Sequence, residues 1–143
     1  MTTRLFDLPF EFVVPDILYK EEFLDWIGPD LVALGLRIVE LEPHEVERAA
    51  LLRRNRAVLS IPDVCAFSLA AERGWTLLTG DGALRMEAQS QRVEMYGVLW
   101  VFDQLQNSGA CPVEDLRDGL TALRDHPRCR LPVREINRRL RLY

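Results

Sequence analysis

Short strand-like and helical segments alternate along most of this chain, from Phe10 to Leu105. The strand-like segments are rich in β-branched, aromatic and other apolar residues; they cover 10–14, 36–41, 75–79 and 92–96. The segments between them carry apolar residues at helical spacing and cover 16–26, 43–53, 60–73, 83–89 and 98–105. This alternation predicts βαβ units and a mostly parallel sheet, which is an α/β fold.

The clearest single helix is predicted over Ser60–Arg73. Ser60 is a natural N-cap, Pro62 falls in the first turn, where its missing N–H costs little, and Gly74 ends the helix. The run Trp75–Thr79 that follows is continuously apolar, so we expect a strand buried on both faces of the sheet. Upstream, Gly28 and Pro29 are expected to stop the helix that begins at Asp16.

The pattern becomes wholly helical from Pro112 onward. Two segments, 112–123 and 132–142, each begin with proline and carry leucine or isoleucine at helical spacing. The length of 143 residues suits one core. We therefore expect an α/β domain over residues 1–110, with residues 111–143 as a helical appendage packed on it.

Composition and charge exclude several classes of protein. No apolar stretch is long enough to cross a bilayer, and no signal-peptide pattern opens the chain, so a cytoplasmic protein that does not bind membranes is expected. The three cysteines form no CxxC pair and are read as reduced thiols, and the two histidines lack zinc-ligand spacing to them. The net charge of −4 gives no indication that the protein binds nucleic acid.

Arginine is nonetheless concentrated at one end of the chain. Seven arginines fall between Arg124 and Arg141, including Arg128 and Arg130, whereas Lys20 is the only lysine. Arginine dominance can simply reflect genomic base composition. The guanidinium group also matches phosphate oxygens, so an arginine-rich tail could contact a polyanion.

Three acids fall where a parallel sheet places its ligands. Asp81 follows the strand 75–79, Asp63 lies in the first turn of the helix leading into that strand, and Glu21 lies in the helix after the strand 10–14. Ligands bind beyond the carboxyl ends of such strands, so we expect the three carboxylates at one rim. Clustered carboxylates raise one another's pKa unless a cation joins them, and Mg²⁺ or Mn²⁺ prefers oxygen ligands.

Each acid also has a purely structural explanation. Asp63 can be part of a capping box, Asp81 can be the N-cap of the next helix, and Glu21 with Glu22 can solvate an exposed helix face. Caps and solvated acids are far commoner than metal ligands. Spacing alone therefore favours the structural explanation for each acid taken singly.

The stretch from Leu59 to Leu105 resembles bacterial PIN-domain proteins. The resemblance is carried by Ser60-x-x-Asp63, Leu77-Leu78-Thr79-Gly80-Asp81, Ala83-Leu84-Arg85 and Gly97-Val98-Leu99-Trp100, and upstream by Phe12–Asp16 with Tyr19–Phe23. It implies a three-layer α/β/α fold and a metal-dependent nuclease, mostly acting on RNA and often the toxin of a toxin–antitoxin pair. By motif position Glu21, Asp63 and Asp81 would be its catalytic and metal-binding acids, with Glu22 as an alternative to Glu21, and Mg²⁺ or Mn²⁺ its cofactor.

The resemblance also implies that something is missing. PIN domains open with a central strand that ends in an acid, whereas Met1–Phe6 resembles the region after the family's first helix, and no apolar strand precedes Asp7. Neighbouring strands would then lack partners for buried backbone groups, at about 1–3 kcal/mol each. We therefore expect an N-terminally incomplete fold, a homo-oligomer that covers the gap, and an impaired nuclease.

Three hypotheses follow for the function. The first is a Mg²⁺- or Mn²⁺-dependent ribonuclease that uses Glu21, Asp63 and Asp81, with RNA as substrate and an antitoxin-type protein as a possible partner. The second is a catalytically inactive PIN-like binding or assembly module, favoured by the missing first acid. The third is that the recorded start is misassigned and the true polypeptide is longer.

Overall fold

A computed structural model describes residues 2–127, 129 and 131–143; Met1, Arg128 and Arg130, which figured in the sequence predictions, lie outside the described residues. The chain divides into two compact units, which are described separately. The central unit is Glu11–Tyr96, and the terminal unit combines the described residues up to Phe10 with Gly97–Tyr143. The predicted α/β domain over residues 1–110 with a helical appendage over 111–143 stays a prediction. The two compact units show where the chain packs together, which does not by itself define domains.

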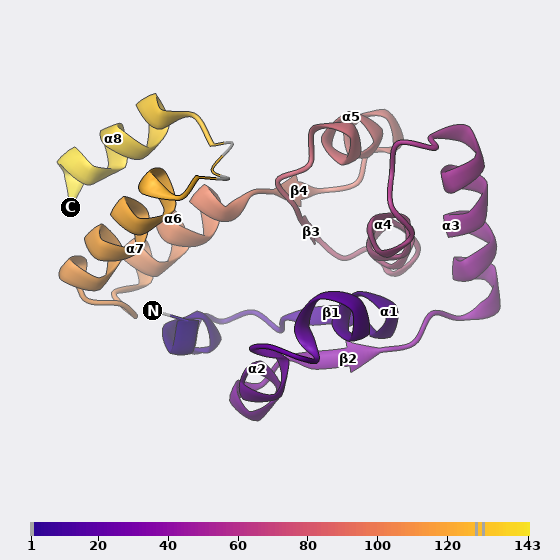
Figure 1. The fold of residues 1–143 in the computed structure, drawn as a ribbon, viewed down its shortest axis with the longest axis horizontal. Coiled ribbons are helices and arrows are strands. Elements are labelled where there is room, and N and C mark those ends of the chain that lie inside the picture. The colour runs from indigo at the N-terminus through magenta and orange to yellow at the C-terminus, as the bar shows by residue number, and fades with distance from the viewer. Residues whose placement is uncertain (1, 128, 130) are drawn as a thin grey trace. The chain divides into compact units, whose positions relative to one another are not determined.

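The central unit contains two short parallel sheets with helices between and after their strands (Figure 1). Strands β1 and β2 pair in parallel with Val14 opposite Ile38, and β3 and β4 pair in parallel with Leu77 opposite Met95. Its elements, in order, are β1 (Val13–Pro15), α1 (Asp16–Leu18), the π-helix η2 (Tyr19–Phe23), α2 (Gly28–Leu34), β2 (Arg37–Val39), α3 (Pro43–Asn55), α4 (Ile61–Arg73), β3 (Leu77–Leu78), α5 (Gly82–Gln91) and β4 (Met95–Tyr96).

The core of the central unit lies between α3, α4, β3 and α5. Phe67 of α4 is completely buried at its centre, and the other members are Ala49, Leu52, Leu59, Val64, Ala70, Leu77, Leu84 and Ala88. Helix α4 also packs against α1 and β1, so the same helix contacts strands of both sheets. Its position therefore decides where the ends of those strands lie.

The prediction for α4 is confirmed in detail. Ser60 is its N-cap, and the Ser60 Oγ accepts a hydrogen bond of 3.2 Å from the backbone N–H of Asp63. Gly74 closes the helix in the left-handed conformation, with φ of +66°. An L-residue with a side chain seldom adopts that conformation, which is why glycine ends the helix here.

Three local predictions need correction. The helix expected over 16–26 is present only over 16–23, as the short α1 continued by the π-helix η2, and Gly28 and Pro29 begin α2 instead of stopping a helix. Proline in the first turn of a helix loses no intrahelical hydrogen bond, so the same residue types suit a start as well as a stop. The strand after α4 is buried on one side only, since Leu77 is buried whereas Leu78 is 40% exposed.

The terminal unit is helical. It contains the 3₁₀-helix η1 (Thr2–Asp7), α6 (Val98–Ser108), α7 (Val113–Asp125) and α8 (Val133–Leu142). Helix α7 lies between α6 and α8, and completely buried Leu116, Leu120 and Ile136 form the centre of their contact. The ring of Phe10 lies 5.4 Å from that of Trp100, which ties the chain before β1 to α6.

The described strands therefore support the α/β class and the parallel pairing. The described part of the chain forms two sheets of two strands; the three-layer arrangement and the N-terminal incompleteness stay predictions. Among the described helices, none is both long and apolar enough to cross a membrane.

Candidate functional site

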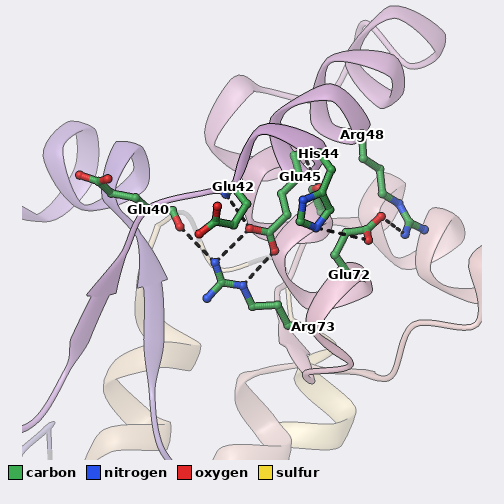
Figure 2. A network of polar contacts seen from close by, with 8 residues as sticks. Glu40, Glu42, His44, Glu45, Arg48, Glu72 and Arg73 are labelled. Atoms are coloured by element: carbon green, nitrogen blue, oxygen red, sulfur yellow. Dashed lines mark hydrogen bonds and ion pairs between the residues drawn. The ribbon is translucent and has the colours of Figure 1, made fainter.

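A buried ion pair fixes α4 against the start of α3 (Figure 2). The carboxylate of Glu45, which is 1% exposed, accepts hydrogen bonds from Arg73 Nε at 2.9 Å and from Arg73 Nη2 at 3.0 Å. The Arg73 hydrogen bond lowers the pKa of the Glu45 carboxyl, against the opposing effect of burial. The carboxylate is thus held charged in the interior by its partner.

The same carboxylate also caps α3. Glu45 Oε1 accepts a 2.7 Å hydrogen bond from the backbone N–H of Glu42, and the Glu42 side chain in turn caps the backbone of residue 45. The hydroxyl of Ser68, on α4, donates to the Glu45 carbonyl at 2.6 Å, and Arg73 Nη2 donates to the Glu40 carbonyl at 3.1 Å. These bonds connect α3 and the residue that follows β2 to α4, the helix that carries Asp63.

Asp81 lies at the carboxyl end of β3 and is the N-cap of α5. Its Oδ1 accepts a 3.0 Å hydrogen bond from the Leu84 backbone N–H, and its own N–H donates to Thr79 Oγ1 at 3.1 Å. The residue is exposed. Asp81 therefore has the N-cap role considered from the sequence. The cap uses only Oδ1, so the second carboxylate oxygen is available to a ligand.

Asp63 lies in the first turn of α4, where an acid is favoured by the helix dipole. Its backbone N–H is used by the Ser60 cap. Within the described residues, its carboxylate oxygens make no hydrogen bond or ion pair. The Asp63 side chain is half-buried, and its carboxylate oxygens are therefore available to a ligand.

Glu21 and Glu22 are both exposed on the π-helix η2. The pKa of the Cys65 thiol, on α4, is raised by burial first and then by the charges of Asp16 and Glu21. The charge of Glu21 thus acts on a group of α4, and the choice between Glu21 and Glu22 as the second acid stays a prediction.

Asp16 is a candidate that the sequence reasoning did not select. It follows β1 directly, whereas Asp81 follows β3 after two residues, and the Asp16 Oδ1 accepts a 2.8 Å hydrogen bond from the Ile17 N–H. The rule that directed attention to Asp81, an acid at the carboxyl end of a parallel strand, applies equally to Asp16. Its charge acts on the same thiol as that of Glu21.

The charges of Asp16 and Glu21 act on the Cys65 thiol, but this does not place the two acids beside Asp63. Asp63 and Cys65 are two positions apart on α4, so their side chains point about 160° apart around the helix axis. Across residues 2–127, 129 and 131–143, no three His, Cys, Asp or Glu side chains are grouped so that they could hold a metal ion. The arrangement as it stands does not fit a three-ligand metal centre, and Glu21, Asp63 and Asp81 as one shared site stay a prediction.

The proximity of Glu21 to Cys65 predicts a chemical result. In a Cys111→Ala/Cys129→Ala background, Glu21→Gln is expected to lower the Cys65 pKa and to speed alkylation by iodoacetamide at pH 8, because the thiolate is the reactive form. Glu22→Gln is the matched control and is expected to leave the rate unchanged. Equal rates in both variants would contradict the placement of Glu21.

Taken together, the parallel strand pairs, the intervening helices and the acids after β1 and β3 define an α/β protein with acidic groups at its strand ends. Residues 3–143 match the family model described as DUF3368: PIN domain. The chain belongs to this PIN-domain family, which confirms the resemblance and supports a nuclease-type function in general terms. No curated protein and no solved structure gives a significant match to the chain.

Proposed function

We propose that this protein is a ribonuclease of the PIN type whose activity needs Mg²⁺ or Mn²⁺ and depends on Glu21, Asp63 and Asp81. The observation that carries the proposal is membership of the PIN-domain family across residues 3–143 together with two acids at element ends: Asp81 follows β3 after two residues, and Asp63 lies at the start of α4. Both side chains keep carboxylate oxygens free of described hydrogen bonds.

Metal dependence is proposed from membership of the PIN-domain family, and it is compatible with the chemistry of the proposed substrate. RNA presents phosphates, and Mg²⁺ commonly uses only one or two protein carboxylates when water and phosphate oxygens complete its shell. The absence of a three-ligand group among the described side chains is compatible with such a sparse site, although it does not support the three acids acting as a preformed cage.

The test is cleavage of end-labelled structured RNA by the purified protein with Mn²⁺, with Mg²⁺ and with EDTA. The proposal predicts cleavage that requires the metal and is lost in Asp63→Asn/Asp81→Asn. Cleavage that persists in EDTA, or that is equal in the double variant, would count against it.

A catalytically inactive PIN-like module is the second candidate, and one observation favours it: the described side chains form no metal-holding group. Calorimetric titration with Mn²⁺ separates the two candidates. A ribonuclease of the proposed type should give a saturable heat, whereas an inactive module should give none.

The proposal extends to the setting of the protein. We place it in the cytoplasm, as the toxin of a toxin–antitoxin pair with an antitoxin-type protein partner, and we expect a homo-oligomer. The oligomer rests on exposed apolar side chains in the central unit, such as Trp26 (74% exposed) and Val58 (78% exposed). Light scattering at micromolar concentration tests it, and a monomer would contradict it.

A further inference from the structure

Helix α8 is held in the terminal unit by one of its faces. Ile136 is completely buried, and Arg139 donates to both carboxylate oxygens of Asp103, on α6, at 2.7 Å each. The hydrogen bond to Asp103 raises the pKa of the Arg139 guanidinium. A bidentate pair of this kind fixes orientation as well as charge, so the rotation of α8 about its axis is set.

The opposite face carries a row of arginines. Arg134, Arg138 and Arg141 are all exposed, and their spacing of four and three residues places them on one stripe of the helix. With a rise of about 1.5 Å per residue, they stand about 6 Å and 4.5 Å apart along the axis. Arg138 contacts Glu135 at 2.9 Å, whereas Arg134 and Arg141 make no ion pair within the described residues.

The helix that carries this stripe is positively charged, whereas the protein as a whole is negatively charged. Helix α8 contains four arginines and one glutamate, giving a net charge of +3 in a chain whose net charge is −4. We propose that Arg134, Arg138 and Arg141 form a contact surface for the phosphate backbone of RNA. The inference rests on the proposed function, because it concerns how the substrate is held.

The form of the stripe favours RNA over an acidic protein. The guanidinium fork matches phosphate and carboxylate oxygens alike, so the distinction comes from what surrounds the three arginines. Protein interfaces usually have an apolar centre, whereas the exposed apolar side chains of α8, Val133 and Leu142, stand at its two ends. Regularly spaced charges without such a centre suit a partner whose charge also repeats, and the contact should show no sequence preference.

The experiment measures binding of fluorescent single-stranded RNA in EDTA, so that neither cleavage nor metal enters. Three variants are compared with the wild type: Arg134→Gln/Arg138→Gln/Arg141→Gln, the corresponding triple lysine variant, and the control Arg37→Gln/Arg54→Gln/Arg92→Gln. The control also removes three exposed arginines, but from the central unit. Arg139 stays in place because it anchors α8, and circular dichroism checks that each variant is folded.

The glutamine variant of α8 is expected to bind about tenfold or more weaker at 0.1 M salt, and the slope of log K against log salt should fall by about 2, since each phosphate contact on a single strand contributes about 0.7. The lysine variant should keep most of the slope, and the control should match the wild type. Unchanged binding of the α8 variant, or an equal loss in the control, would overturn the inference.

Two further arms distinguish the alternatives. Polyglutamate replaces RNA in the first; if the α8 substitutions weaken its binding as much as that of RNA, the surface serves an acidic protein and the inference is overturned. The second measures RNA binding by a protein that fails the cleavage assay. Binding that depends on the stripe then supports the inference even though the proposed nuclease has failed.

Discussion

Asp81→Asn is expected to reduce metal-dependent RNA cleavage by about a hundredfold or more, which corresponds to about 2.7 kcal/mol of activation free energy. Asparagine caps a helix about as well as aspartate, so the 3.0 Å bond from the Leu84 N–H should be kept and the fold should be unaffected. The substitution therefore removes the charge of Asp81 while preserving its structural role. Initial rates of cleavage, together with a thermal melt, measure the two effects separately.

Two controls make this result specific. Asp81→Ser also keeps an N-cap oxygen and should lose activity equally, whereas Asp30→Asn, in the first turn of α2, removes an exposed acid elsewhere and should change nothing. If Asp81→Asn retained full activity, Asp81 would be only a helix cap. The structural explanation considered from the sequence would then be sufficient for it.

Arg73→Met is expected to destabilise the protein by about 3 kcal/mol, because it leaves the buried Glu45 carboxylate without its partner. We take the lower end of the usual range because the Arg73 side chain is itself 26% exposed. Urea unfolding at pH 7 measures the change in the free energy of unfolding. Arg48→Met is the matched control: Arg48 pairs with the partly exposed Glu72 at 2.9 Å, and its loss should cost less than about 1 kcal/mol.

A second variant separates the charge from the contact. Glu45→Gln/Arg73→Met should be more stable than Arg73→Met alone, because a glutamine at this position can still cap α3 and leaves no unpaired charge. The opposite order would show that the ion pair does not hold α4.

The lowered pKa of Glu45 fixes the direction of the pH effect. A carboxyl whose pKa is lower in the folded state contributes stability above its unfolded pKa, and that contribution is lost as the pH falls through the folded pKa. The difference in unfolding free energy between the wild type and Arg73→Met should therefore shrink on acidification below about pH 4.

The elements that the sequence predicted well are those with local signals at both ends. Ser60 and Gly74 bound α4 by N-cap and left-handed C-cap chemistry that acts within a few residues, and the structure confirms both. The strand 75–79 was overestimated because a continuous apolar run does not say which face will be covered. Leu78 remains 40% exposed, since the burial of a strand depends on neighbours far away in the sequence.

The candidate site was predictable only residue by residue. That Asp81 follows a strand and Asp63 opens a helix could be read from local patterns, and both positions are confirmed. Whether Glu21 reaches them depends on the π-helix η2 and on how it turns against α4, which apolar periodicity does not encode. The Glu45–Arg73 ion pair could not be predicted either, because its two residues are 28 positions apart in the sequence and no local pattern links them.

The central proposal is that Glu21, Asp63 and Asp81 lie around one divalent ion whose shell is completed largely by water and phosphate, and paramagnetic broadening by Mn²⁺ tests it most directly. At 16.5 kDa, the ¹⁵N-labelled protein is within reach of amide-resolved spectra. Substoichiometric Mn²⁺ should broaden the amide signals around residues 21, 63 and 81 together, and Asp81→Asn should abolish the effect at all three. Broadening confined to one of these segments, or found only elsewhere, would contradict the claim.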